Sequence, residues 1–330
     1  MSLPSHIRPP APGMSAAMQV WSASSAAPGR QMNEDHAFQF GPLVGVLDGA
    51  TVPEGFETGC VHGPAWYVRR LAARLAVAEA ERPAAGLTGN LAAAILAVRA
   101  DHGGRCDLDH PGTPSATVCL LRHSGDQVEY LVLCDSTLVV DCGEVRVISD
   151  HRLARAVADV RTTARTTTSG GGRVDPATSF RRAVALQRRQ MNQTHGYWVA
   201  AADPDAAFHA VTGSLPLDGP YRVRRAALLT DGAARAVDPF ALCNWAGLLD
   251  LLTEQGPQEL IRRIRSAEYA DDTPITTGQL PRFKRHDDAT ATLCVFGPEA
   301  SEDVPDLRPS RAGAEEVDGK GRSAPEDSTS

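Results

Sequence analysis

The sequence predicts a layered α+β domain, and three of its features lead to this fold class. Short apolar runs separated by turn residues recur near both ends and in the middle of the chain. Blocks with helical periodicity stand between them. The resulting order of strands, two helices, strands and then further helices excludes a simple repeat of strand–helix–strand units.

The N-terminal part is predicted to form strands over Met18–Ser24, His36–Phe40 and Leu43–Leu47, with a Gly41-Pro42 turn before the last of them. Two helices follow. Residues 64–80 repeat apolar side chains at a helical period.

Thr88 can cap the second helix, which is predicted to end near His102-Gly103-Gly104. An antiparallel meander comes next, because strand-like runs and turns alternate at short spacing. Its strands are predicted at Ala116–Arg122, Gln127–Cys134, Thr137–Asp141 and Glu144–Ile148.

The segment 151–195 is rich in arginine and contains a flexible break at Ser169–Gly172. Its second half, Pro176–Gln193, is predicted to be an amphipathic helix. The arginines of the segment are Arg152, Arg155, Arg161, Arg165, Arg173, Arg181, Arg182, Arg188 and Arg189.

The last part of the chain returns to strands and ends in two helices and a strand. The strands are predicted at Tyr197–Ala201, Ala207–Val211, Tyr221–Leu229 and Ala289–Phe296. The helices are predicted at Pro239–Gln255 and Pro257–Ala270, with Gly256 between them and proline in the first turn of each.

Acidic residues stand at the tips of four predicted strands: in Arg30–Asp35, at Asp48-Gly49, at Asp231-Gly232 and in His286–Asp288. Carboxylates at the ends of neighbouring strands can converge on one edge of a sheet, where they repel each other unless a cation neutralises them. Oxygen ligands without His or Cys suit Mg²⁺ or Mn²⁺ rather than zinc. A nearby arginine offers a planar fork to phosphate, so the set indicates hydrolysis of a phosphate ester.

These motifs resemble those of the metal-dependent serine/threonine protein phosphatases, the type 2C (PPM) family. That family has an Arg-x-x-x-Glu-Asp segment, two Asp-Gly pairs that follow strands, and a late Asp-Asn/Asp-x-Thr that opens a final strand. A further element, Ser115–Val118 followed by Leu131–Ser136, resembles the Ser/Gly-Thr-Thr strand and Gly-Asp-Ser hairpin of the family. The resemblance runs from about Met18 to Gly297.

The resemblance implies two stacked antiparallel β-sheets flanked by helices on both faces, with a metal centre at one end. It also implies two Mg²⁺ or Mn²⁺ ions and a role for each motif residue. Asp48 would bridge both ions, the Gly49 carbonyl would add a ligand, Asp231 and Asp287 would be terminal ligands, Glu34 and Asp35 would hold metal-bound waters, Asp135 would help to hold a third ion, and Arg30 would bind the substrate phosphate.

Three positions depart from the family pattern. Ala50-Thr51-Val52 stands where the family often has His-Gly-Gly, whose histidine is a proposed general acid; His36, His62 and His286 lie near the motifs in sequence and are the possible substitutes. Arg235 stands where another aspartate is common, which speaks against a third ion. Cys134 replaces the hairpin glycine.

Each motif also has a plain structural interpretation, since Asp-Gly pairs form turns and isolated carboxylates lie on surfaces. The function expected from the whole set is hydrolysis of phosphoserine or phosphothreonine in proteins, by attack of a metal-activated water. The alternatives are a non-catalytic or weakly active type 2C-like regulatory or binding module, and a hydrolase of a non-protein phosphate ester.

Composition limits the partners. A net charge of −7 and a pI near 5.8 argue against a nucleic-acid or membrane-surface binder, and no apolar run is long enough to span a membrane. The seven cysteines form no Cys-x-x-Cys pair, which suggests neither a zinc site nor a disulfide framework. Cys60, Cys119, Cys134, Cys243 and Cys294 are expected to be buried free thiols, in keeping with a cytoplasmic protein.

The domain boundaries follow from composition. Residues 1–17 contain four prolines and no apolar stretch and are expected to form a disordered leader. Residues 298–330 are acidic, rich in Pro, Ser and Gly and without aromatic residues, and are expected to form a disordered tail. Between them, the resemblance implies a phosphatase-like domain over 18–297, in which the arginine-rich segment 151–195 occupies the place of the variable flap of the family.

Overall fold

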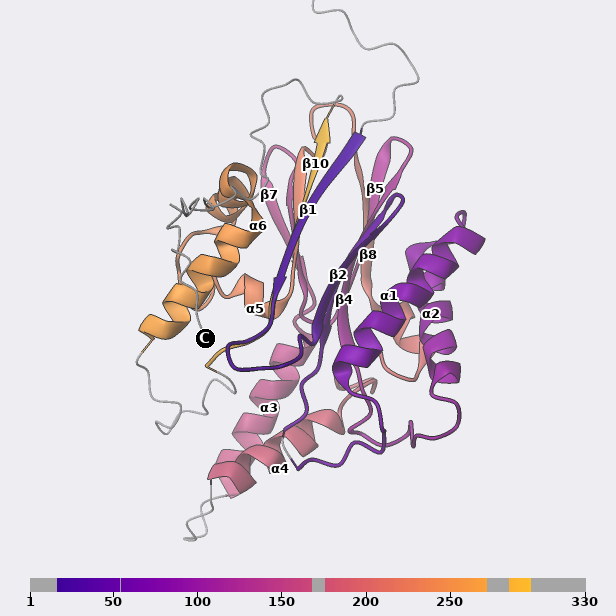
Figure 1. Ribbon diagram of the computed structural model, residues 1–330, viewed down its shortest axis with the longest axis vertical. Helices are drawn as coiled ribbons and strands as arrows, with labels where there is room; N and C mark the ends of the chain where they lie inside the picture. The colour runs from indigo at the N-terminus through magenta and orange to yellow at the C-terminus, as the bar shows by residue number, and fades with distance from the viewer. Residues whose placement is uncertain (1–16, 54, 168–175, 272–284, 298–330) are drawn as a thin grey trace, which may run out of the picture.

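Two five-stranded antiparallel sheets pack face to face, and helices cover both outer surfaces (Figure 1). The computed structural model describes residues 17–53, 55–167, 176–271 and 285–297, so that the expected tail and all but the last residue of the expected leader lie outside the described residues. The four-layer α-β-β-α arrangement confirms the predicted fold class.

The first sheet has the strand order β1-β10-β9-β6-β7, and every neighbouring pair is antiparallel. Its strands are β1 (Ala17–Ser25), β10 (Ala289–Gly297), β9 (Arg225–Leu229), β6 (Thr137–Asp141) and β7 (Val145–Ser149). Helix α6 (Trp245–Ala270) packs on its outer face through leucine and isoleucine side chains.

The second sheet has the order β2-β3-β4-β5-β8 and is also antiparallel throughout. Its strands are β2 (Asp35–Phe40), β3 (Leu43–Gly49), β4 (Ala116–Ser124), β5 (Gln127–Leu133) and β8 (Val211–Pro216). Helices α1 (Pro64–Glu81) and α2 (Leu87–Asp101) cover it on the side away from the first sheet (Figure 1).

Strand β3 shows why the central strands are apolar on both faces. Leu43 and Leu47 pack against α1 and α2, whereas Val44 and Val46 pack between the two sheets. Because successive side chains of a strand point to opposite faces, a strand covered on both sides needs a continuous apolar run rather than an alternating one.

The predicted meander over 116–148 is wrong as a single unit, since it is divided between the sheets. Strands β4 and β5 form a hairpin in the second sheet, and β6 and β7 form one in the first. The chain crosses between the sheets at Cys134-Asp135-Ser136. Cys134 has φ of 67°, in the left-handed region that disfavours side chains with a Cβ, which explains why a glycine suits this place.

The helical predictions are confirmed at α1 and α2, although Gly86 rather than Thr88 is the N-cap residue of α2. The predicted break at Gly256 is present, with φ of 82° inside α6. The helix before it begins at Trp245 and not at Pro239, because the Asn244 side chain accepts a hydrogen bond from Gly247 N at 2.8 Å.

Other elements differ from their predicted boundaries. Residues 197–201 form isolated bridges rather than a strand. The predicted strand Ala207–Val211 begins inside a 3₁₀ helix, η1 (Pro204–His209), and the strand of this region, β8, begins only at Val211. Helix α3 (Arg152–Thr167) was not predicted, and α4 (Pro176–Arg188) ends earlier than expected. In these segments, tertiary packing overrides the local pattern.

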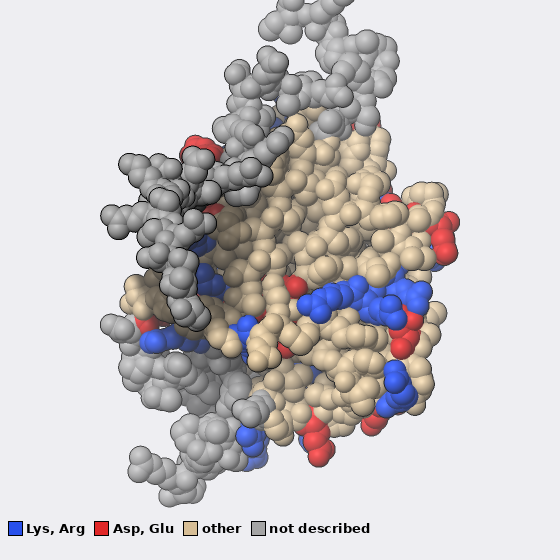
Figure 2. All heavy atoms as spheres, viewed as in Figure 1, with Lys and Arg blue, Asp and Glu red and all other residues tan. Residues whose placement is uncertain are grey.

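Arg side chains gather in a band over α1 and α2 on the face shown in Figure 2. Arg70 and Arg74 of α1 both form ion pairs with Asp101 of α2. Within the described ranges, no helix has both the length and the apolar character that a membrane crossing requires.

Candidate functional site

A cleft of about 670 Å³ collects most of the predicted site residues, and residues of α3 and α4 line part of it. Figure 1 shows these two helices at one end of the sandwich. The predicted residues that line it are Arg30, Asp48, Gly49, Asp135, Asp231 and Asp287. Glu34 and Asp35 do not line the cleft.

Strand register brings these residues together from distant parts of the sequence. Asp35 and Asp48 are direct cross-strand partners in the β2–β3 pair. In the other sheet, Leu229 pairs with both Thr137 and Ala291. The residues that flank these pairing positions, among them Asp135, Asp231 and Asp287, therefore leave the sheets at the same end.

The glycines of the two Asp-Gly pairs allow close approach between strand ends and are not hairpin turns. A Cβ at Gly49 would lie 2.8 Å from the Glu34 carbonyl oxygen and 2.8 Å from Cβ of Pro64. A Cβ at Gly232 would lie 1.9 Å from the Asp288 carbonyl oxygen. Any larger side chain would push the acidic segments apart.

Asp288 positions the first acidic segment and does not line the cleft. Its carboxylate is buried and accepts hydrogen bonds from Ala27 N at 2.7 Å and from Glu34 N at 2.6 Å. Glu34 in turn pairs with Arg30 at 2.8 Å and accepts a hydrogen bond from the Thr51 hydroxyl. Asp288 and Glu34 thus fix the position of Arg30 at the cleft.

Asp35 is buried behind the cleft with one oxygen satisfied and one not. Its Oδ2 accepts a hydrogen bond from the Thr230 hydroxyl at 2.8 Å, whereas Oδ1 has no hydrogen-bond partner among the described residues. Burial raises the pKa of Asp35 to about 8; the hydroxyl groups of Thr230 and Thr290 oppose this rise, and the neighbouring carboxylates of Asp231 and Asp288 add to it. A buried acceptor without a partner is the environment expected for a carboxylate that holds a cation or its water.

The other cleft carboxylates are perturbed in the same direction. Burial and then repulsion from Asp35, Asp231, Asp287 and Asp135 raise the pKa of Asp48 well above its usual range. Burial and repulsion from Asp231 raise the pKa of Asp135 to about 7. Several oxygen ligands that cannot all be charged without a counter-ion fit a site for hard divalent cations such as Mg²⁺ or Mn²⁺.

These pKa shifts predict how the stability of the protein depends on pH without added Mg²⁺ or Mn²⁺. The folded state binds protons at Asp35 and Asp135 more tightly than the unfolded state, so their contribution is favourable below the usual pKa of 3.8 and is lost as the pH rises to about 8. Thermal scans should give a lower Tm at pH 8 than at about pH 5, and Mn²⁺ should raise Tm most at pH 8. Asp35→Asn should flatten this slope, and a Tm that rises with pH in the unsubstituted protein would contradict the assignment.

The three histidines that could replace the missing general acid, His36, His62 and His286, lie outside the cleft. No histidine of the described segments lines the cleft. His36 lies beside Arg69 in a separate depression, His62 contacts Cys60 and His102, and His286 contacts the Glu268 carboxylate at 3.0 Å.

Arg235, the other main departure, lines the cleft but is held by groups outside the acidic cluster. Its guanidinium donates to Glu268 Oε1 at 2.7 Å and to the Arg285 carbonyl at 3.0 Å, and it lies over the Phe240 ring. Arg235 is therefore a fixed positive group at the edge of the cleft.

The sequence places Arg188 among the arginines of the flap and does not predict that its side chain is buried. Arg188 is 5% exposed, lines the cleft and donates to Ala50 O at 3.1 Å and to Thr51 O and Thr113 O at 3.4 Å each. It braces the backbone that follows Asp48-Gly49. The available signal was its place near Val184 on the apolar side of α4.

The arginine-rich segment does border the cleft. Helices α3 and α4 pack on each other, and Leu153, Val157 and Val184 contribute apolar lining. Arg181 and Arg182 are exposed, whereas Arg152 pairs with Asp150 at 2.6 Å. The predicted break at Ser169–Gly172 and the side chains of Arg161, Arg165 and Arg173 lie outside the described residues.

No family model matches this chain, and no curated protein matches it by sequence. Solved structures do. A serine/threonine phosphatase from S. agalactiae has a TM-score of 0.52 at 16% identity, covering 85% of this chain and 100% of its own. The serine/threonine phosphatase Stp1 from Staphylococcus aureus has a TM-score of 0.50 at 13% identity, covering 88% and 100%.

A third structure is the catalytic domain of the serine/threonine protein phosphatase PstP in complex with two manganese ions. It has a TM-score of 0.50 at 17% identity and covers 85% of this chain and 99% of its own. Identities this low establish shared architecture and leave the chemistry to the site. The chain therefore has the fold of the PPM-type serine/threonine phosphatases, the family that its motifs resemble.

Proposed function

We propose that the protein is a metal-dependent phosphatase that hydrolyses phosphoserine or phosphothreonine in proteins. The observation that carries the proposal is the convergence of Asp48, Asp135, Asp231 and Asp287 with Arg30 on one cleft. This set of oxygen ligands beside a guanidinium matches the needs of a divalent cation and a phosphate together.

The residues of the site would have three tasks: to hold the ions, to position water and to bind the phosphate. Asp48, the Gly49 carbonyl, Asp231 and Asp287 would hold two Mg²⁺ or Mn²⁺ ions, which supply Lewis acidity that lowers the pKa of a bound water. Glu34 and Asp35 would position waters from behind, and Asp135 would be a weaker ligand.

Arg30 would bind two phosphate oxygens and stabilise the charge that develops on them during hydrolysis. It is 38% exposed and is held by Glu34 at 2.8 Å, so that it reaches the cleft from a fixed position. A fixed donor loses little conformational freedom when substrate binds.

A second candidate, a non-catalytic or weakly active binding module, rests on Arg235 and on the lack of a cleft histidine among the described residues. A fixed guanidinium in place of an acidic ligand reduces the affinity for a third ion. It also adds a second positive group that suits retention of a phosphorylated partner.

The proposed substrate class, a phosphoprotein, is favoured by the flap. Exposed Arg181 and Arg182 on α4 would add positive charge next to an acidic cleft in a protein of net charge −7. Such a rim attracts dianionic phosphopeptides.

The test compares hydrolysis of p-nitrophenyl phosphate and of a phosphothreonine peptide, with Mn²⁺ and without it. We expect manganese-dependent release of phosphate from both substrates, and faster release from the peptide at low ionic strength than at high. Binding of the peptide without turnover would support the binding module instead. Turnover of the small ester alone would indicate a non-protein substrate.

A further inference from the structure

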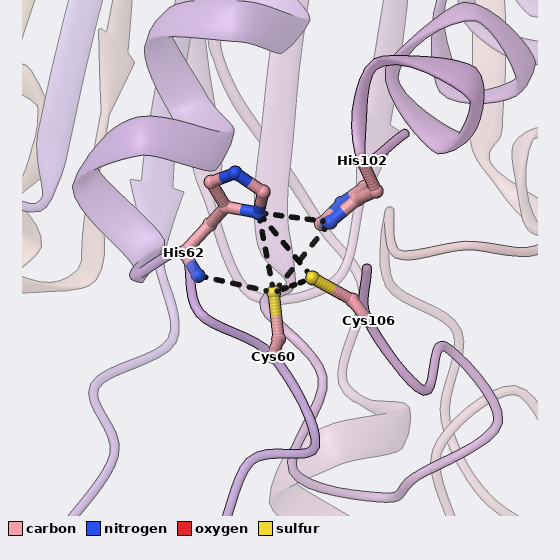
Figure 3. A group of neighbouring side chains, drawn as sticks. All are labelled: Cys60, His62, His102 and Cys106. Atoms are coloured by element: carbon pink, nitrogen blue, oxygen red, sulfur yellow. Dashed lines mark hydrogen bonds between the residues drawn. The ribbon is translucent and has the colours of Figure 1, made fainter. Parts of the chain in front are cut away.

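Four side chains that the cleft does not use converge between two loops, as Figure 3 shows. Cys60 and His62 precede α1, His102 is the C-cap residue of α2, and Cys106 lies in the loop after it. Their sulfur and nitrogen atoms all lie within 4.8 Å of one another. His102 is buried, and the other three residues are half-buried.

Four of the distances among these atoms are within about 0.2 Å of the edges of a tetrahedron around a single zinc ion. Zinc bonds of about 2.3 Å to sulfur and about 2.0–2.1 Å to nitrogen place tetrahedral ligands about 3.5 Å apart for a sulfur and a nitrogen, and about 3.4 Å apart for two nitrogens. Here, Cys60 Sγ lies 3.5 Å from Nδ1 of His62 and 3.5 Å from Nδ1 of His102, Cys106 Sγ lies 3.5 Å from His62 Nδ1, and the two Nδ1 atoms are 3.2 Å apart.

We propose that Cys60, His62, His102 and Cys106 bind one Zn²⁺ ion in a closed Cys₂His₂ site that holds the two loops together. Two thiolates and two imidazoles fill a tetrahedral shell and leave no position for substrate, which is the arrangement of structural zinc sites. The soft ligand set differs in kind from the oxygen ligands of the cleft. The inference therefore does not depend on the proposed phosphatase activity.

The surroundings hold the ligands in place. His62 stacks on Trp66 with ring centroids 4.0 Å apart and an interplanar angle of 18°, and His102 lies edge-on to the same ring at 4.8 Å. The backbone N–H of His62 donates to Cys60 Sγ at 3.3 Å, a contact that stabilises a thiolate (Figure 3). One aromatic side chain thus orients both imidazoles.

A disulfide is the competing use of the two cysteines. Their sulfurs are 3.2 Å apart, well beyond the bond length of about 2.05 Å, and both cysteines are free. A disulfide would also leave the two facing Nδ1 atoms without a common partner, whereas an ion satisfies all four groups at once. Around zinc the sulfurs would separate to about 3.8 Å, a small movement for two loop residues.

The sequence does not indicate this site because it contains no Cys-x-x-Cys pair, the spacing that marks many zinc sites. The ligands come instead in the patterns Cys60-x-His62 and His102-x-x-x-Cys106, each a short pair that a single ion can span. The prediction that Cys60 is a buried thiol is also wrong, since Cys60 is half-buried, as is Cys243, whereas Cys119, Cys134 and Cys294 are buried as expected.

The position of the site suggests what the ion would stabilise. Asp107 N donates to Gly59 O at 2.8 Å, so the two loops already meet beside the cluster. Further along the second loop, the carbonyl of Thr113 accepts from Arg188, which also holds Ala50 O and Thr51 O next to the cleft. Fixing the loops would therefore fix the backbone that follows Asp48-Gly49.

The test measures metal in the protein purified under reducing conditions without added metal. We expect about one zinc ion per chain, lost in Cys60→Ser and Cys106→Ser and retained in Cys243→Ser, which changes a half-buried cysteine outside the cluster. Asp48→Asn, which alters only the cleft, should also keep its zinc. Loss of zinc should lower Tm, because an ion that binds only the folded state stabilises that state.

Cobalt gives a readout that does not require the variants to fold. Protein refolded with Co²⁺ in place of zinc should show the intense visible bands of tetrahedral cobalt and a near-ultraviolet thiolate-to-cobalt charge-transfer band, which oxygen ligands in the cleft cannot produce. Absence of zinc together with absence of the charge-transfer band would overturn the proposal. So would a Cys60–Cys106 disulfide, found by mass spectrometry, in the protein as purified.

Discussion

Asp48→Asn should abolish metal-dependent phosphate release while leaving the protein folded. Asp48 lines the cleft with Asp135, Asp231 and Asp287, and an amide of the same shape cannot neutralise a cation. Turnover should fall by more than about 100-fold, since even the outer partners of metal ligands contribute about 10- to 100-fold. Initial rates over a Mn²⁺ titration measure the effect.

The same variant should melt at a higher temperature than the unsubstituted protein when no Mg²⁺ or Mn²⁺ is added. Burial and four neighbouring carboxylates raise the pKa of Asp48, so its ionised form is unfavourable at neutral pH and a neutral amide relieves the repulsion. Asp141→Asn is the matched control, because Asp141 also ends a strand but pairs with Arg225 away from the cleft. Full activity of Asp48→Asn, or equal losses in both variants, would contradict the assignment.

Glu268→Met should lower the free energy of unfolding by about 3–5 kcal/mol, because it leaves buried positive charges without a counter-ion. Glu268 is 0% exposed, and its carboxylate contacts Arg235 and Arg265 at 2.7 Å each and His286 at 3.0 Å. Arg265 also donates to the Ser25 carbonyl at the end of β1. The Glu268 carboxylate thus links α6 to Arg235, which follows α5 (Asp231–Ala234), and to His286, which precedes Asp287.

Urea unfolding of Glu268→Met beside Glu259→Met tests this role. Glu259 lies on the same helix and also pairs with two arginines, Arg262 and Arg263, but its partners are 66% and 44% exposed. Its replacement should cost no more than about 1 kcal/mol. Equal losses in the two variants would mean that the buried pair network does not support the fold.

The sequence was sufficient for the fold class because the strongest patterns are local. The apolar run of β3, the helical period of α1 and the glycine that breaks α6 each depend on neighbours in the chain, and all were predicted. Local patterns do not say which sheet a strand joins, and the 116–148 meander was therefore misassigned. The crossing at Cys134 depends on packing between the sheets, which no window of sequence contains.

The acidic cleft was predicted in outline because its residues stand at strand ends, a position that sequence can identify. Whether strand ends meet depends on register: Leu229 faces both Thr137 and Ala291, and this places Asp135, Asp231 and Asp287 together. The different tasks of two adjacent aspartates, Asp287 at the cleft and Asp288 on the backbone of Ala27 and Glu34, depend on side-chain direction.

What the sequence determined by itself was the set of strands and helices strong enough to form from local periodicity, and the kinds of ligand at their ends. Only the tertiary structure decided which polar groups meet. The buried Arg188 side chain donates a hydrogen bond to the Ala50 carbonyl, and Glu268 is the counter-ion of Arg235 and Arg265. His62 and His102, some forty residues apart in sequence, came within 3.2 Å, because the packing of α1 on α2 joins loops that share no local pattern.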